Sequence, residues 1–181
     1  MKLKRSEQVT TIYWTELIHQ DWKIILAATD KGLCYVGGVD QSLANLQQWA
    51  SSKIGTCEMK QDEQYMANYM QAFRRYLAGE CSTFTCSTDL YGTPFQQSVW
   101  QALLQIPYGS TYSYSELADQ LGRRDAVRAV STAIGANPVL IAIPCHRVIG
   151  KNGSLTGFRG GLPMKEALLH LEQGHVLQLN K

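Results

Sequence analysis

Residues 143–148 read Ile-Pro-Cys-His-Arg-Val, and the rest of the chain is best interpreted outward from Cys145 in this stretch. A thiol next to an imidazole, with a proline before the pair and an arginine after it, has the composition of a nucleophile with its base. The run 137–144 before it is mostly apolar, and five glycines follow between residues 150 and 161. We therefore expect a buried segment that delivers the cysteine to a flexible, glycine-lined pocket. The alternative is that Cys145 is a buried small hydrophobic residue, which is the usual role of a free cysteine.

The composition is that of an ordinary globular protein of one or two domains. The 181 residues are 45% apolar and 18% charged, which allows a sizeable core and argues against disorder. No apolar stretch follows the basic residues at positions 2–5, so we expect no signal peptide, and no run is long enough to span a bilayer. Five cysteines without a secretion signal indicate reduced thiols and a cytoplasmic protein.

Positive charge is concentrated in the half of the chain that holds Cys145. Residues 1–92 carry nine Lys/Arg and ten Asp/Glu, a net charge of −1, whereas residues 93–181 carry eight and five, a net charge of +3. Contacts with nucleic-acid phosphates need such charges. A solvated protein surface gives the same pattern, so the charge alone leaves both interpretations open.

The N-terminal half is predicted to be an α/β domain with a three-stranded antiparallel sheet. Residues 9–19, 22–29 and 32–39 are rich in β-branched and aromatic side chains, and residues 42–51 and 63–77 have helical spacing. On the second helix a buried stripe is expected every four residues, at Tyr65, Tyr69, Phe73 and Leu77. Residues 81–90 indicate a strand or a linker, so we place one domain over residues 1–88 and the next over 89–181. No zinc site is expected, because Cys81 and Cys86 lack a matching second pair.

The C-terminal half is predicted to be mostly α-helical, with helices over residues 95–104, 113–121, 125–135 and 163–173. Gly122-Arg123-Arg124 joins the second helix to the third, which is the layout of a helix-turn-helix. Glu172 falls in the last predicted turn of the final helix, where a carboxylate is unfavourable against the helix dipole. We therefore expect an imidazole partner for it, from His146, His170 or His175.

The helix predicted over residues 125–135 has two different faces. Its apolar face, expected in the core, consists of Val127, Val130 and Ile134. Its opposite face carries one long side chain and three small residues, namely Arg128, Ser131, Thr132 and Gly135. Small residues allow a close approach to a DNA minor groove, with the arginine entering the base stack. Alternatively, they pack against another helix and leave Arg128 in solvent.

Five stretches of the C-terminal half, taken together, resemble the O6-alkylguanine-DNA alkyltransferases. They have that family's order and spacing, and they are Thr93-Pro-Phe-Gln-Gln-Ser-Val-Trp100, Ile106-Pro-Tyr-Gly-Ser-Thr-Tyr-Ser-Tyr114, Arg128-Ala-Val130, Asn137-Pro138 and Ile143-Pro-Cys-His-Arg-Val148. The resemblance covers residues 93–175. Over residues 1–90 it is only topological and implies a ribonuclease-H-like α/β domain. Some family members hold a structural zinc, but the cysteines and histidines here do not match such a site, so neither a metal nor a cofactor is implied.

The resemblance implies a role for each residue of the motif around Cys145. Cys145 would accept the alkyl group, and His146 would be its base through a bridging water. Glu172 would orient His146, and Asn137 would brace the turn before the active-site segment. Tyr114 would help to rotate the nucleotide out of the duplex and would donate a hydrogen bond to the guanine ring as it leaves.

The resemblance also implies a DNA-contacting surface and a pocket for the flipped base. Arg128 would fill the vacated space in the base stack, and the other DNA contacts would be Tyr114, Ser131, Thr132, Gly135 and Arg124. The pocket would be formed by Val148, Phe158, Arg159 and Trp100. Many relatives have a tyrosine and a serine where Phe158 and Arg159 stand, so Arg159 is expected to add a cation at the rim of the pocket.

The implied function is direct-reversal DNA repair by irreversible transfer of an alkyl group to Cys145, once per protein molecule. The partner would be duplex DNA containing O6-alkylguanine, bound by a monomer through the minor groove, with O4-alkylthymine as a second candidate substrate and no membrane involved. Three other functions are weighed against this one: a non-enzymatic lesion sensor, a helix-turn-helix regulator and a thiol hydrolase. A lesion sensor would replace the nucleophile, a regulator would not need the Pro-Cys-His-Arg segment, and a hydrolase would need oxyanion donors.

Overall fold

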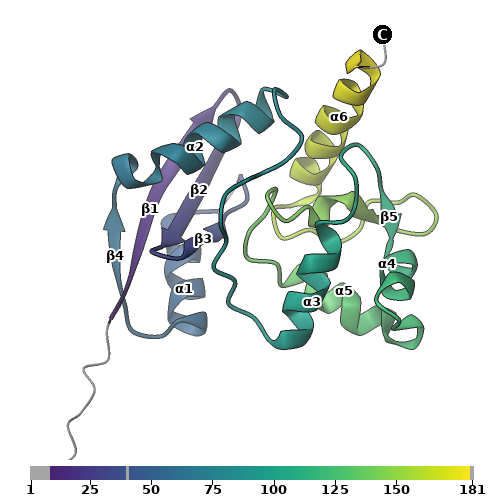
Figure 1. Cartoon of the computed structure of the whole chain (residues 1–181), viewed down its shortest axis with the longest axis horizontal. Helices are drawn as coiled ribbons and strands as arrows, with labels where there is room; N and C mark the ends of the chain where they lie inside the picture. Colours follow the sequence, from purple (N-terminus) through teal and green to yellow (C-terminus); the bar gives the residue numbers. More distant parts are fainter. Residues whose placement is uncertain (1–8, 40, 180–181) are drawn as a thin grey trace, which may run out of the picture.

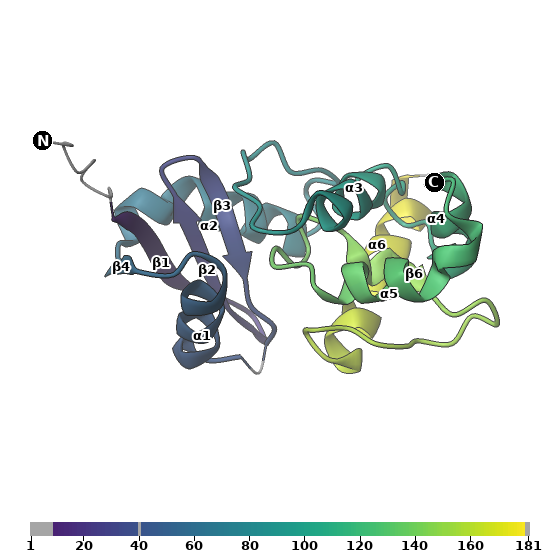
Figure 2. The same cartoon turned by 90° about the horizontal axis from the view of Figure 1, so that it is seen from below.

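The computed structural model describes residues 9–39 and 41–179. Two regions lie side by side, an N-terminal sheet with its helices and a C-terminal group of helices (Figures 1 and 2). The segment that follows α2 (Glu63–Leu77) crosses from the first region to the second. It pairs with the edge of the sheet at a single bridge between Leu33 and Thr88, so residues 81–90 are mainly a linker.

The N-terminal sheet has four strands in the order β3-β2-β1-β4. Strands β1 (Thr10–His19), β2 (Trp22–Thr29) and β3 (Gly32–Val36) pair antiparallel, as predicted, although β3 ends three residues earlier than expected. The predicted number of three strands is wrong, because a fourth strand, β4 (Cys57–Gln61), pairs parallel with β1. The sequence of β4 is Cys-Glu-Met-Lys-Gln, a half-exposed edge strand with few strong β-formers, and it therefore gives little strand signal.

Helices cover both faces of this sheet. Along β2 successive side chains point to opposite faces, and Ile24 and Leu26 pack under α2 while Ile25 and Ala27 pack on α1 (Leu43–Lys53). The buried side chains of α2 are Met66, Met70, Phe73, Tyr76 and Leu77. The predicted stripe was therefore wrong at its start, where Tyr65 is 39% exposed. A strict four-residue spacing advances by about 40° per step around a helix, so Tyr65 and Leu77 cannot share one face.

The C-terminal region contains α3 (Pro94–Leu103), α4 (Tyr114–Gln120), α5 (Val127–Gly135) and α6 (Leu162–Leu179). Two very short strands, β5 (Tyr112–Ser113) and β6 (Val148–Ile149), pair in parallel. The helix expected from residue 125 begins instead as a 3-10 turn over Arg124–Ala126, which is followed by α5. Cys145–Arg147 form a second 3-10 turn, directly before β6.

The expected end of the last helix at Gly174 is wrong, since α6 continues to Leu179. A glycine inside a helix costs only about 1 kcal/mol relative to alanine, so it does not oblige the helix to stop. Glu172 is therefore not in the last turn, and the helix-dipole argument for its imidazole partner does not apply.

Within the described residues there is no group of three His, Cys, Asp or Glu side chains that could hold a metal ion. None of the helices described is both long and apolar enough to cross a membrane.

Candidate active site

Cys145 begins a 3-10 turn at the end of a buried segment, and only 4% of it is exposed. The side chain of Asn137 holds this segment in three places. Its Nδ2 donates to the Cys145 Sγ over 3.0 Å and to the Ile143 carbonyl over 2.9 Å, and its Oδ1 accepts from the Val139 N–H over 2.9 Å. Asn137 therefore both shapes the turn and contacts the thiol.

His146 and Glu172 form a completely buried pair. The imidazole Nε2 lies 2.7 Å from the Glu172 Oε1, and both side chains are 0% exposed. His146 is thus the partner of Glu172; His170 lies at the surface, and the side chain of His175 is outside the described residues. The second ring nitrogen, Nδ1, is buried and has no hydrogen-bond partner among the described residues.

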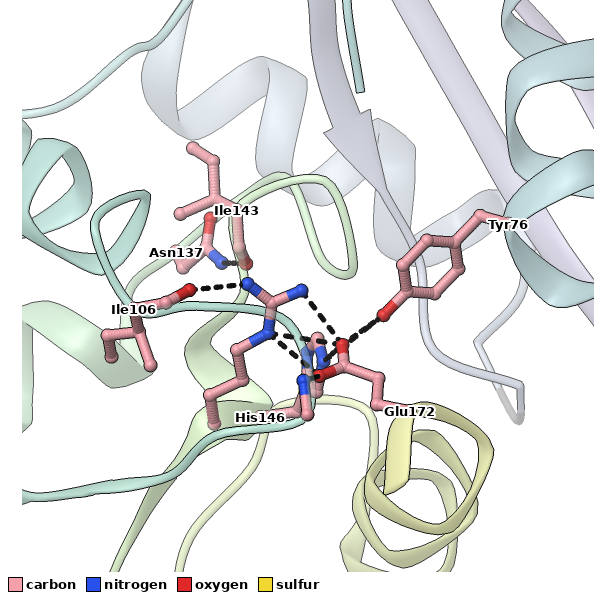
Figure 3. A network of polar contacts seen from close by, with 8 residues as sticks. Tyr76, Ile106, Asn137, Ile143, His146 and Glu172 are labelled. Atoms are coloured by element: carbon pink, nitrogen blue, oxygen red, sulfur yellow. Dashed lines mark hydrogen bonds and ion pairs between the residues drawn. The ribbon is translucent and has the colours of Figure 1, made fainter. Parts of the chain in front are cut away.

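Both oxygens of the Glu172 carboxylate accept hydrogen bonds (Figure 3). Arg147 donates through Nε over 2.9 Å to Oε2 and through Nη2 over 2.9 Å to Oε1, and the Gly109 N–H donates to Oε2 over 2.9 Å. The Tyr76 hydroxyl donates to Oε1. Burial raises the pKa of Glu172, but the bonds from His146, Arg147 and Tyr76 outweigh it and hold that pKa at about 2. The group is therefore a carboxylate at neutral pH.

The charge state of Glu172 fixes the tautomer of His146. Burial lowers the pKa of His146, and the hydrogen bond and charge of Glu172 oppose that shift only in part. The imidazole is therefore neutral, its single proton lies on Nε2 facing the carboxylate, and Nδ1 carries a lone pair. Burial also raises the pKa of the Cys145 thiol, against the Asn137 hydrogen bond and the charges of Arg159 and Lys165. The resting pair is a neutral thiol beside a neutral base.

Lys165 is a second buried ionic group of α6. Its Nζ donates to the Val148 carbonyl over 2.6 Å and to the Thr156 carbonyl over 2.8 Å. The Tyr114 hydroxyl donates to the same Thr156 carbonyl over 3.1 Å. Burial lowers the pKa of Lys165 to about 8. Lys165 thus ties the strand after Cys145 to the loop that contacts Tyr114.

The side of α5 opposite the core is open to solvent. Val130 and Ile134 are buried as predicted, whereas Arg128, Thr132 and Gly135 are exposed. A concavity of about 590 Å³ is lined by Tyr114, Val127, Arg128, Ser131, Thr132, Thr156 and Gly157. A side chain added at Gly135 would meet nothing within 4 Å among the described residues, so no other helix packs against this position. Arg124 is exposed but paired with Asp119 over 2.9 Å.

Comparison with known proteins identifies the family. Two family models match, described as 6-O-methylguanine DNA methyltransferase, ribonuclease-like domain, over residues 12–90, and DNA binding domain of the same enzyme, over residues 94–174. The inducible methylated-DNA–protein-cysteine methyltransferase of Bacillus subtilis is 47% identical, over 90% of this chain and 91% of that protein. The chain belongs to the 6-O-methylguanine DNA methyltransferase family.

Solved structures of the methyltransferase family have the same fold. The crystal structure of the OGT of Mycobacterium tuberculosis in complex with DNA matches with a TM-score of 0.78 and 39% identity, over 90% of this chain and 94% of that one. A methyltransferase from Pyrococcus kodakaraensis, at 22% identity, shares the fold with a TM-score of 0.70. The resemblance drawn from the five sequence motifs is therefore confirmed at the level of family and two-part architecture.

Two residues expected in the pocket of this methyltransferase, Trp100 and Arg159, are held by hydrogen bonds within the protein. Trp100 is in the core, where its Nε1 donates to the Ala133 carbonyl over 2.8 Å and ties α3 to α5. The guanidinium of Arg159 lies between the two regions of the chain, near enough to Cys145 for its charge to lower the pKa of that thiol. It donates to the carbonyls of Val36, Asn137 and Pro138 over 2.6, 3.0 and 2.9 Å. Tertiary packing decides both positions, and neither is visible in the local sequence.

Val148 and Phe158 were also expected in the pocket. Val148 is fully buried in β6, and its carbonyl is occupied by Lys165, so that oxygen is already engaged within the protein. Phe158 is partly buried and packs against the main core.

The sequence interpretation missed three residues of the site, namely Tyr76, Arg147 and Lys165. Arg147 lies inside the decisive motif, where an arginine next to a buried Cys-His pair is itself a signal for a buried carboxylate. Lys165 lies three residues before Leu168 and seven before Glu172, which places it on the buried face of α6. Tyr76 lies three residues after the buried Phe73, but nothing in the sequence links it to Glu172.

Proposed function

We propose that this protein repairs DNA directly by transferring a methyl group from the O6 atom of guanine to the Sγ of Cys145. The observation that carries this proposal is the buried Cys145-His146-Glu172 arrangement, in which the His146 Nδ1 has no hydrogen-bond partner among the described residues. Because neighbouring side chains diverge, Nδ1 reaches the thiol through a bridging water, and a buried polar atom of this kind is the usual partner of such a water.

His146 Nδ1 takes the thiol proton through the water, so the positive charge that forms on the ring faces the Glu172 carboxylate. The Sγ then attacks the saturated methyl carbon, an S–C bond forms, and the O6–C bond breaks. The electron pair of that bond passes to the guanine ring, which receives a proton from the Tyr114 hydroxyl. The proton on His146 then restores Tyr114 through solvent, and guanine leaves unmodified.

The reaction consumes the protein. The product on Cys145 is a thioether, which water does not hydrolyse under the conditions of a protein site. Among the described residues no second thiol contacts Cys145 to regenerate it. Each molecule therefore acts once, whereas a thiol hydrolase would turn over.

The mode of DNA binding is part of the same proposal. Helices α4 and α5 form a helix-turn-helix, and the exposed small residues of α5 enter the minor groove of duplex DNA. Arg128 fills the space of the flipped nucleotide, and Tyr114 lies at the same concavity, where it guides the base toward Cys145. Ser131, Thr132, Gly135 and, once released from Asp119, Arg124 contact the backbone. O4-methylthymine is a second substrate.

The remaining parts of the proposal concern the protein as a whole. A ribonuclease-H-like N-terminal domain, residues 1–88, supports a reactive domain, residues 89–181. The protein is a cytoplasmic monomer that uses no metal or cofactor in the transfer.

The test is a count of methyl groups. The protein is incubated with an excess of duplex DNA that carries labelled O6-methylguanine, and the expected result is one methyl per molecule, located on the Cys145 peptide by mass spectrometry. Cys145→Ala should abolish transfer and retain DNA binding, whereas Cys86→Ala, which removes a partly buried thiol of the linker, should transfer normally. Turnover beyond one methyl would contradict the proposal, as would a label on another cysteine.

A further inference from the structure

The N-terminal region reaches into the active site through one side chain. Tyr76 lies on α2, is completely buried, and donates its hydroxyl to the Glu172 Oε1 across the boundary between the two regions (Figure 3). The same hydroxyl is 3.4 Å from the His146 Nε2. The three groups therefore meet at one carboxylate oxygen.

We propose that Tyr76 is a positioning residue of the methyl transfer, whose hydroxyl holds the Glu172 carboxylate in the orientation that His146 requires. This inference rests on the proposed function. It assigns to the N-terminal region a part in the chemistry beyond support of the reactive domain.

The geometry gives the hydroxyl two effects. First, it fixes the carboxylate, because Oε1 is held between the hydroxyl of Tyr76 and the Nη2 of Arg147 while it faces the Nε2 of His146. Second, a hydrogen bond to Oε1 draws negative charge away from the atom that stabilises a protonated imidazole. Tyr76 therefore keeps His146 a weaker base than Glu172 alone would make it.

The ring of Tyr76 alone cannot explain the tyrosine. The ring packs against Phe84 and Tyr108, with centroid distances of 5.0 and 5.8 Å, and a phenylalanine would make the same contacts. Burying a hydroxyl is unfavourable unless it is hydrogen-bonded, so the bond to Glu172 is what makes the hydroxyl tolerable there. Tyr108 offers a contrast, because its hydroxyl is buried in the same cluster without a partner among the described residues.

Several other titratable or charged groups surround His146 and bear on its pH dependence. They come from the turn after α3, from its own segment and from α6, and they are Tyr108, Cys145, Arg147, Lys165 and Glu172. The substitution Tyr76→Phe removes none of these groups.

The test compares Tyr76→Phe with Tyr108→Phe, two removals of a single buried hydroxyl from one aromatic cluster. Methyl transfer from O6-methylguanine duplex DNA is measured under single-turnover conditions across pH, together with Tm and Kd for unmodified duplex. For Tyr76→Phe we expect about a tenfold lower rate constant at neutral pH, the range of one hydrogen bond to a charged group. Its acidic limb should move to higher pH, because a more basic His146 becomes neutral later. Tyr108→Phe should stay within about twofold of the unaltered protein.

Two results would overturn the proposal. One is a Tyr76→Phe profile that coincides with that of Tyr108→Phe. The other is a lower transfer rate constant for Tyr76→Phe with an unshifted acidic limb, which would show that the hydroxyl contributes only to the stability of the protein. Alkylation of Cys145 by iodoacetamide, followed on the Cys145 peptide across pH, separates this inference from the proposed function. If the unaltered protein transfers no methyl, the proposed function fails, while the iodoacetamide profiles still test whether Tyr76 governs His146.

Discussion

Glu172 and Lys165 lie two turns apart on the buried face of α6. The negative charge of Glu172 faces a cation, whereas the positive charge of Lys165 faces carbonyl oxygens. Glu172 faces the cation of Arg147 and further donors, which hold its pKa at about 2. Lys165 faces two carbonyl oxygens, with no carboxylate within ion-pair distance among the described residues, and burial lowers its pKa to about 8. Glu172, which is beside the base His146 on one side of Cys145, therefore keeps its negative charge at neutral pH. Lys165, which holds the loop on the other side, has a pKa close to neutral pH and is therefore close to losing its positive charge.

The difference follows from what each side has to do. A base that accepts a proton during the reaction needs a fixed anion beside it, since the cation that forms is otherwise expensive in a buried site. The loop after β6 needs only hydrogen-bond donors to hold its carbonyls, and a lysine supplies several from one atom. Under the proposed mechanism, Glu172 serves the chemistry and Lys165 the shape of the site.

The largest effect is expected from Glu172→Ala. The substitution leaves Arg147 buried without its carboxylate and His146 without its orienting group, and breaking a buried pair in this way costs about 3–5 kcal/mol. Transfer should slow by at least about 100-fold, corresponding to the loss of roughly 3 kcal/mol of transition-state stabilisation. Urea unfolding and single-turnover transfer measure the two effects. Glu166→Ala, an exposed carboxylate on the same helix, is the matched control, and equal effects from both variants would contradict the comparison.

The pH dependence of stability should show the same asymmetry. Glu172 has a folded pKa of about 2 against an ordinary value of 4.5, so its stabilisation is present above pH 4.5 and is lost as pH falls toward 2. The loss amounts to roughly 3 kcal/mol, at about 1.4 kcal/mol per pKa unit. For Lys165, with a folded pKa of about 8 against 10.5, the unfolded chain binds the proton more tightly, so stability rises with pH between those values.

Urea unfolding at a series of pH values measures both limbs. Glu172→Gln should flatten the acidic limb and leave the alkaline one, whereas Lys165→Met should do the reverse. An unfolding free energy that changes equally in both variants at both ends of the pH range would contradict the assignment of the limbs.

Lys165→Met should have a smaller effect on stability than Glu172→Ala. The carbonyls of Val148 and Thr156 lose a donor, which is unfavourable, but the cost of burying an ammonium disappears at the same time. We expect a net loss of about 1–2 kcal/mol and a rate about tenfold lower, because the loop that contacts Tyr114 is less well held. Lys151→Met, in the exposed part of the same loop, is the control. A loss of transfer rate as large as that of Glu172→Ala would show that Lys165 acts in the chemistry.

Much of this site could be predicted from the sequence, because a short motif carries it. Cys145 and His146 are adjacent, and Asn137 lies eight residues before the thiol, so local spacing restricts their geometry. Glu172 was predicted to pair with an imidazole for a reason that proved wrong, since α6 does not end at Gly174.

What escaped prediction depends on contacts between distant segments. Tyr76 and Glu172 are 96 residues apart and belong to different regions, so no local pattern joins them. Strand β4 is an exposed edge whose identity comes from pairing with β1 rather than from its own residues. The same holds for Arg159, since its partners are backbone carbonyls and the side chain of Gln41, 118 residues away.

Arg159 extends the comparison to a partly buried ionic group, and its substitution should have the smallest effect. Its guanidinium joins the end of β3 to the Asn137–Pro138 turn and lies over the Tyr35 ring, 4.9 Å from the centroid. Arg159→Lys keeps the charge but loses the planar fork that reaches several oxygens at once. Because Asn137 is still held by the Val139 N–H, the turn should persist, with a loss of about 1 kcal/mol and a two- to threefold slower transfer.

Arg123→Lys, at an exposed position, is the control for Arg159→Lys in thermal unfolding and single-turnover transfer. The position of Arg159 makes one outcome decisive. If Arg159→Lys altered the preference between methyl and benzyl adducts while Tm stayed unchanged, the guanidinium would act on the substrate, as expected for a cation at the pocket rim. A lower Tm with an unchanged preference is the result that its contacts to Val36 and Pro138 predict, since they hold the guanidinium between the two regions.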